Sequence, residues 1–308
     1  MALPLNRGPA AALSRGGRAG GSRPLRERDA FALGMLAPAL LWQALFYVVP
    51  LLLIVGTSLW AMENYRLVVE WSFDNYRTVL TDALYRSPYG TSLLLAGAVV
   101  LVTAVVAYPL AYGLAFIVPP RLRPLLIVGL VAPFWTNYLV RAYAWQILIG
   151  NNGVWNYLLT RTGLLDQPVP LLNTGWAAGI GLTHYLLPVV TLTLYTTMEN
   201  INRNLLEAAL DLGASRWSVF RHVVFPLSRP GLAVGAVLAF VLAFTDFISP
   251  AVLGGQNIRV VPQLVVDAVQ WNVDYPRAAA MAVLMIVVIL AVVAALRRAL
   301  DLPVERAS

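Results

Sequence analysis

The chain contains no cysteine and no lysine, and it has few charged residues of either sign. Its 308 residues hold 22 basic side chains, all of them arginine, and 15 acidic ones. Without cysteine there can be no disulfide framework and no thiolate metal site. Without lysine there can be no Walker A phosphate loop, because that loop needs its lysine. The chain cannot hydrolyse ATP with that machinery, so energy from ATP must enter through another subunit.

Histidine is scarce as well, since His184 and His222 are the only two. We therefore expect no metal site, no cofactor bound by this chain and no catalytic residue. Charged residues make up 12% of the chain, whereas soluble domains carry about 25%. With 59% hydrophobic residues and a mean hydropathy of +0.71, the composition indicates an all-α integral membrane protein.

Six apolar segments are each long enough to cross a membrane, which takes about 20 residues. The expected spans are about Phe31–Leu59, Gly90–Val118, Leu125–Ile149, Thr174–Thr197, Gly231–Leu253 and Arg277–Ala295. We expect one domain of six transmembrane helices over residues 30–298. Residues 1–29 are predicted to be a disordered basic cytoplasmic tail, and residues 299–308 a short cytoplasmic tail.

Arginine is distributed unevenly between the two sides that six spans define. The tails and the loops after spans two and four hold fifteen arginines, whereas the other loops hold six. Positive residues favour the cytoplasmic side of a membrane. Both termini and the loop after the fourth span are therefore predicted to be cytoplasmic.

That loop, residues 199–230, contains the sequence EAALDLGASRWSVFRHVVFPLSRP from Glu207 to Pro230 and is called the Glu207 loop below. Leu205, Ala209 and Leu212 recur at helical spacing, which predicts a short amphipathic helix. Gly213 is a natural end for it, because glycine accepts the positive φ of a helix C-cap.

A second short helix is expected after Gly213. Ser215 can cap its start, and Trp217, Phe220 and Val224 form its apolar face. Pro226 and Pro230 are expected to end it and to begin the next span. Two short helices at an angle would present a small knob to a partner. The alternative is an interfacial hairpin without a partner.

The spacing within the loop resembles the EAA signature of permease subunits of bacterial ABC importers. The similarity rests on Glu207-Ala208-Ala209, on Gly213 six residues later and on Pro226 thirteen residues after the glycine. The resemblance implies that the loop, with Ala214 and Phe220, is a coupling helix seated in a groove of an ATPase subunit that binds ATP.

Two further stretches, APFWTNYLVRAYAWQILIGNNGVWN and FTDFISPAVLGG, are similar to the spermidine/putrescine branch of these importers. Relatives in that branch carry ferric iron, opines or other small, amino-acid-like solutes, so those substrates stay open. The resemblance implies a type I ABC importer fold. It also implies ABC ATPase subunits, a second permease subunit, a periplasmic or lipid-anchored binding protein and membrane lipid as partners, and no nucleic acid.

Polar residues within the third expected span share one helical face, since Asn137, Arg141 and Trp145 are spaced i, i+4, i+8. A charged group inside a membrane costs at least about 2.5 kcal/mol, so such groups normally face protein or water. The face is a candidate lining of a water-filled path. The alternative is that Arg141 extends to the outer head groups. For a cationic substrate Arg141 would need a carboxylate partner, for which Asp246 is a candidate.

Asp246 is the first candidate for substrate contact, with Thr245 beside it in the fifth expected span. A carboxylate and aromatic rings suit an alkylammonium ion, through charge and cation–π attraction. Trp135 and Tyr138 could add to such a site. The alternative is that Asp246 holds neighbouring helices together.

We therefore interpret the chain as a permease subunit of an ATP-driven ABC importer, most consistent with polyamines, that carries out no bond chemistry. An ion-coupled secondary transporter is an alternative, but it needs more intramembrane carboxylates. A membrane-embedded enzyme would need a cluster of His, Asp or Ser at catalytic spacing, which the expected spans lack.

Overall fold

The computed structural model describes residues 25–299. These residues belong to two compact units, and the division along the chain falls between Leu53 and Ile54. The tail expected at 1–29 lies outside the described residues except for 25–29, which begin helix α1. The tail expected at 299–308 lies outside them after residue 299.

The first unit is a helical segment that contains most of the first expected span. It comprises α1 (Leu25–Gln43), a π-helical turn η1 (Ala44–Val48) and the start of α2 (Val49–Thr57). The apolar stretch Gly34–Thr57 is long enough to cross a membrane, close to the bounds predicted. The π-helical turn ends two residues before Pro50, whose ring nitrogen has no hydrogen to donate to the turn before it.

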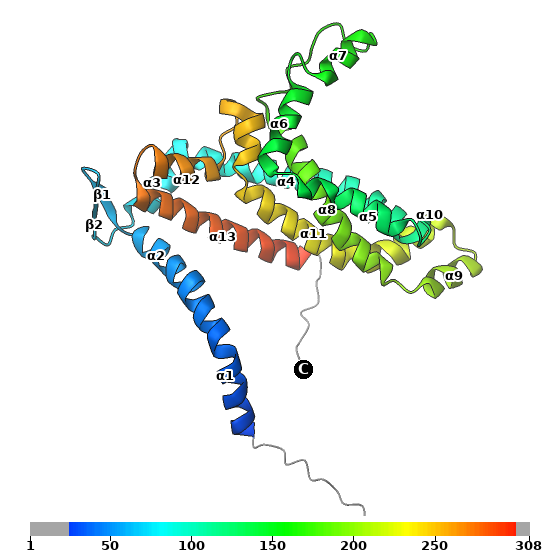
Figure 1. Cartoon of the computed structure of the whole chain (residues 1–308), viewed down its shortest axis with the longest axis horizontal. Helices are drawn as coiled ribbons and strands as arrows, with labels where there is room; N and C mark the ends of the chain where they lie inside the picture. The colour runs from blue at the N-terminus through cyan, green and yellow to red at the C-terminus, as the bar shows by residue number, and fades with distance from the viewer. Residues whose placement is uncertain (1–24, 300–308) are drawn as a thin grey trace, which may run out of the picture. The chain divides into compact units, whose positions relative to one another are not determined.

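The second unit contains the other helices and one small hairpin (Figure 1). Its elements are β1 (Ala61–Glu63), β2 (Arg66–Val68), α3 (Asp74–Thr81), α4 (Ala83–Tyr112), η2 (Gly113–Ile117), α5 (Arg123–Val131), η3 (Ala132–Trp135), α6 (Tyr138–Ile149), α7 (Val154–Arg161), α8 (Gly175–Glu199), α9 (Arg203–Asp211), α10 (Arg216–Val219), η4 (Phe220–Val224), α11 (Phe225–Thr245), η5 (Pro250–Gly254), η6 (Gly255–Asn257), α12 (Val261–Gln270) and α13 (Tyr275–Ala299). The strands pair antiparallel around Asn64 and Tyr65, which both have positive φ, as a two-residue hairpin turn requires.

Within residues 25–299, five helical stretches are long and apolar enough to cross a membrane, and a sixth is counted if one bent helix pair is taken as a single span. With the bent pair counted, the number agrees with the six spans expected. The second span begins earlier than predicted, at Ala83, because Asp82 caps α4 by accepting a hydrogen bond from Leu84 N at 2.9 Å. The fourth and sixth spans, α8 and α13, begin and end within a few residues of their predicted bounds.

The third and fifth expected spans are wrong as continuous helices. The third is broken after Trp135, and the two pieces, Arg123–Trp135 and Tyr138–Arg161, are bent by 94°. The fifth begins already at Arg216 and ends at Thr245. Each break falls on a Thr-Asx pair, Thr136-Asn137 or Thr245-Asp246. Asn and Asp side chains bond to nearby backbone amides and so compete with the helix.

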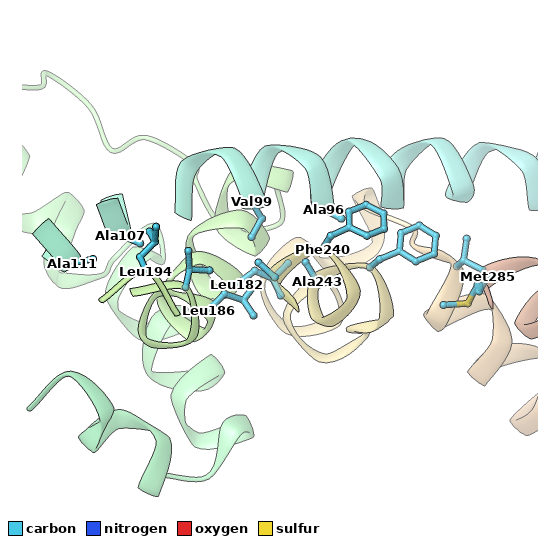
Figure 2. Close-up of a cluster of buried hydrophobic side chains, with 14 of the residues drawn as sticks. Ala96, Val99, Ala107, Ala111, Leu182, Leu186, Leu194, Phe240, Ala243 and Met285 are labelled. Carbon is cyan, nitrogen blue, oxygen red and sulfur yellow. The ribbon is translucent and has the colours of Figure 1, made fainter. Parts of the chain in front are cut away.

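The centre of the second unit is a three-helix packing of α4, α8 and α11 (Figure 2). Small residues of α4, such as Ala96 and Ala107, belong to the same buried core cluster as Leu182 and Leu186 of α8 (Figure 2). Small residues let membrane helices approach closely, which favours their association through van der Waals contact. The helix α9 lies at the end of this bundle opposite α12 (Figure 1).

The helices α8 and α11 approach each other closely at Gly231. A Cβ atom at this position would lie 2.8 Å from the backbone oxygen of Thr193, which cannot move without shifting α8. We expect Gly231→Ala to destabilise the subunit by about 1–3 kcal/mol through overpacking. Gly97→Ala in α4 is the matched control, because a Cβ atom there meets nothing within 4 Å. Thermal unfolding of the two purified variants in detergent would test this, and equal stabilities would contradict it.

Candidate functional site

The two broken helices meet at their interruptions. The hydroxyl of Tyr138, at the start of α6, is hydrogen-bonded to the hydroxyl of the buried Ser249 at 2.7 Å. Tyr138 follows the break at Thr136-Asn137, and Ser249 follows the break at Thr245-Asp246. This pair of adjoining interruptions is called the double break below. Non-helical backbone at membrane depth is tolerated where it is buried in protein or lines a water-filled cavity.

Asp246 organises one half of the double break. It ends α11 with an extended backbone, φ −76° and ψ 131°. Its carboxylate accepts hydrogen bonds from Ser249 N at 2.9 Å and from Ile248 N at 3.4 Å. Asp246 therefore caps the short helical segment that leads into η5. The carboxylate is half-buried, so part of it remains accessible.

Arg141 is held in a cage of aromatic rings. Its guanidinium lies 5.1–5.7 Å from the ring centres of Phe134, Tyr138 and Tyr185, and Nη1 donates to Pro133 O at 3.0 Å. The residue is 9% exposed. Cation–π attraction at such distances offsets part of the cost of burying the charge. The ring of Tyr138 therefore already makes a cation–π contact with Arg141 of the same chain.

The suggested pairing of Arg141 with Asp246 is wrong. Among the side chains that the structure describes, the ion pairs within 4 Å are Arg123–Glu199 and Arg277–Asp274. Sequence reasoning could not foresee the aromatic cage, because Tyr185 comes from α8, far away along the chain.

Asn137 and Trp145, the other members of the predicted polar face, also make structural contacts. The Oδ1 atom of Asn137 accepts from Leu139 N at 2.8 Å and so caps α6. Trp145 Nε1 donates to Nδ1 of His184 on α8 at 3.2 Å. The face that unites Asn137, Arg141 and Trp145 is therefore used largely to fix α6 in place.

The other candidate path residues at the double break have exposed side chains. Trp135 is 77% exposed, and Thr245 and Phe247 are exposed as well. Two helical segments, α5 with η3 and α11, end here with the negative ends of their dipoles, and two others, α6 and the segment that leads into η5, begin here with the positive ends. The Asp246 carboxylate is therefore the group at the double break that suits a cation. The sequence feature that could have located the double break is the presence of a Thr-Asx pair inside each of two apolar runs.

The second candidate region is the Glu207 loop, and its first helix is α9. The side chain of Asn202 accepts from Asn204 N at 3.0 Å and caps its start. At its end, Ala214 N bonds to Ala209 O at 3.0 Å and Gly213 N to Leu210 O at 2.9 Å, which is a Schellman motif. Gly213 has φ +85°, so its predicted role as the helix end is confirmed.

The second helix of the loop differs from the prediction. Ser215 caps it as expected, accepting from Ser218 N at 3.2 Å. However, Pro226 and Pro230 do not end it, because the helix continues from Arg216 to Thr245. The π-helical turn η4 at Phe220–Val224 ends two residues before Pro226, whose ring nitrogen has no hydrogen to donate to the helix. The second helix is thus the first part of the fifth span.

The Glu207 loop presents apolar side chains on its exterior. Leu212 is 89% exposed and Trp217 is 67% exposed, while Ala208 leaves room for close approach. The inner side is held by Leu206, which packs on the core, and by Phe220, whose ring makes edge contacts with Tyr108 and Tyr112 of α4. Ala209, Ala214 and Pro226 are half-buried. The result is a fixed knob with an apolar tip.

Glu207 is exposed on α9. Arg203 lies one helical turn earlier on α9, at the spacing of an ion pair with Glu207, but the two side chains do not pair. The guanidinium of Arg203 donates instead to Ala115 O, at 3.0 Å. Glu207 forms no hydrogen bond or ion pair with another residue that the structure describes. Its carboxylate is therefore presented to solvent.

Comparisons with known proteins agree with this architecture. The family described as "Binding-protein-dependent transport system inner membrane component" matches residues 115–306. The spermidine/putrescine transport system permease protein PotB of Escherichia coli (strain K12) is 38% identical over 215 residues, covering 70% of this chain and 78% of that protein. The permease protein PotC of the same organism is 32% identical over 111 residues, covering 36% of this chain and 42% of that protein.

The fold has a counterpart among solved structures. A crystal structure of a bacterial ABC transporter involved in the import of the acidic polysaccharide alginate superposes with a TM-score of 0.74 at 19% identity, covering 89% of this chain and 96% of that one. The chain therefore has the type I importer fold and belongs to the family of binding-protein-dependent transport system inner membrane components, as a multi-pass permease of an ABC importer.

Proposed function

We propose that this permease imports polyamines such as spermidine and putrescine, and that the double break is part of its substrate path. The observation that carries the proposal is the half-buried carboxylate of Asp246 at the place where two broken helices meet. Carboxylates attract cations, and so do the C-terminal helix ends among the four ends that lie there. The similarity to proteins named for spermidine and putrescine supports the same chemistry.

The path residues have two kinds of role in this proposal. Asp246 and Thr245 contact an ammonium group of the substrate, and the exposed ring of Trp135 adds cation–π attraction. Asn137, Arg141, Tyr138 and Trp145 act mainly by holding the broken helices in position. A cation on the path is kept out of direct contact with Arg141, because three aromatic rings lie against that guanidinium.

The Glu207 loop is proposed to dock on an ABC ATPase subunit. Its exposed leucines and Trp217 would enter an apolar groove, and the free carboxylate of Glu207 would meet a basic or amide group at the rim. The arginine distribution supports a cytoplasmic position for this loop and for both termini. ATP is then bound by the partner and not by this chain.

Two further partners complete the proposed importer. A second, different permease subunit is supported by the similarity of this chain to both PotB and PotC, which are named for one transport system. A binding protein, periplasmic or lipid-anchored, would deliver the substrate. Closure of two ATPase subunits would move the Glu207 loops and thereby open the permease pair outward. ATP hydrolysis would return the pair to its inward-facing state.

Uptake of labelled putrescine and spermidine is the direct test. Cells that lack their own polyamine importers would express this chain with its neighbouring transporter subunits, and Glu207→Lys would serve as the control. Saturable uptake that the control loses supports both the substrate class and the docking loop. If the complex assembles and hydrolyses ATP but takes up no polyamine, the assignment of polyamines as the substrate is wrong. A ferric iron, opine or amino-acid-like solute would then be the class to examine.

A further inference from the structure

One backbone carbonyl at the α9 end of the second unit is shared by two arginines from different helices. The oxygen of Ala115, in η2, accepts from Arg123 Nη2 and from Arg203 Nη2, both at 3.0 Å. Arg123 is the first residue of α5, and Arg203 is the first residue of α9. The end of the second span, the start of α5 and the start of α9 therefore meet at a single atom.

Further contacts extend this cluster to the end of α8. Arg123 Nε donates to Val118 O at 3.0 Å, and Arg123 Nη1 lies 3.6 Å from Glu199 Oε1. Tyr195 donates its hydroxyl to the same carboxylate oxygen at 2.7 Å. We call the four side chains of Arg123, Tyr195, Glu199 and Arg203 around the Ala115 carbonyl the arginine clasp. The side chain of Arg123 is only 13% exposed.

Helix stability does not explain the placement of these charges. Arg123 and Arg203 stand at helix N-termini, and Glu199 stands at a C-terminus. In each case the helix dipole opposes the charge. The favourable interactions are those between the elements, where charged groups form the stronger kind of hydrogen bond. The clasp therefore acts between helices and not within them.

We propose that the arginine clasp transmits displacement of α9 to α4, α5 and α8. The helix α9 is joined to its neighbours along the chain by two short turns, and Arg203 lies one helical turn before Glu207. A push on the exposed side of α9 reaches the Ala115 carbonyl through Arg203. Arg123 and Glu199 then carry it to α5 and α8. The proposal rests on the proposed docking of the Glu207 loop on an ATPase.

The first test measures substrate transported per ATP hydrolysed, in proteoliposomes that hold the complete transporter. Arg203→Met and Arg123→Met are expected to lower this ratio at least fivefold while ATP hydrolysis continues. Arg203→Lys should lie between, since it keeps one donor. Arg121→Met is the matched control in the same turn. Arg121 is exposed and makes no side-chain hydrogen bond or ion pair within 25–299. An unchanged ratio for Arg203→Met would overturn the proposal.

The second test measures whether α9 and the turn before α5 move together. Because the chain has no cysteine, Asn204→Cys and Arg121→Cys give one pair of labelling sites in this subunit, and any cysteines of the partner subunits are replaced before the complete transporter is spin-labelled. The distance between the labels should stay constant between nucleotide-free and ATP-bound states, and it should change or broaden once Arg203→Met is added. A distance that already changes with Arg203 intact would refute the clasp. If Glu207→Lys also leaves uptake normal, the docking proposal fails first.

Discussion

Glu207→Lys is expected to reduce ATP-driven uptake at least tenfold while the protein still inserts into the membrane. Glu207 is exposed and makes no ion pair with a described residue, so its replacement leaves the fold of this chain intact. The reversed charge instead meets the partner that the carboxylate is proposed to contact. Mispaired charge at an interface is costly and weakens association. Uptake and ATP hydrolysis measured on the same preparation would show whether substrate still stimulates the ATPase.

Two control substitutions show whether the effect depends on charge reversal and whether it depends on the position of Glu207. Glu207→Gln keeps the size of the side chain and should cost less uptake than lysine does. Glu63→Lys makes the same charge change at an exposed position on the hairpin and should leave uptake near normal. If Glu207→Lys accumulated substrate at the normal rate, the Glu207 loop would not be the coupling element.

Gly213 offers an independent way to disturb the same element. Its φ of +85° is strained for any residue with a Cβ atom. Gly213→Val should therefore deform the Schellman motif and shift the tip of the knob, without touching the membrane-spanning core. We expect coupled ATP hydrolysis to fall in step with uptake, and unchanged uptake would show that the loop tolerates a different shape.

The sequence was sufficient for the features that depend on local patterns. Apolar runs of about 20 residues indicate spans whatever they pack against, and the Schellman glycine and the Ser215 cap follow from backbone geometry alone. The double break was not foreseen, because hydropathy averages over a window and one Thr-Asx pair hardly changes the average. The cage of Arg141 depends on Tyr185, and the bond of Arg203 depends on Ala115. Both partners are distant in sequence, so neither contact follows from a local pattern.

Asp246→Asn is expected to lower polyamine uptake about 10- to 100-fold. An ionic hydrogen bond contributes about 1.5–3 kcal/mol, and each 1.4 kcal/mol corresponds to a factor of ten. The carboxylate accepts from Ile248 N with one oxygen, at 3.4 Å, and from Ser249 N with the other, at 2.9 Å. Asparagine keeps a single oxygen, which can retain the shorter bond from Ser249 N. The substitution therefore removes the charge and preserves the shorter of the two capping bonds.

Three comparisons make the Asp246 result decisive. Asp246→Ala removes both the charge and the cap and should also lower thermal stability, which Asp246→Asn should not. Asp82→Asn neutralises another capping aspartate, at the start of α4, and should leave uptake unchanged. ATP hydrolysis should persist in Asp246→Asn, because the Glu207 loop is untouched. Normal uptake by Asp246→Asn would mean that Asp246 is only a helix cap, and the cation would have to be recognised by the helix ends and Trp135 alone.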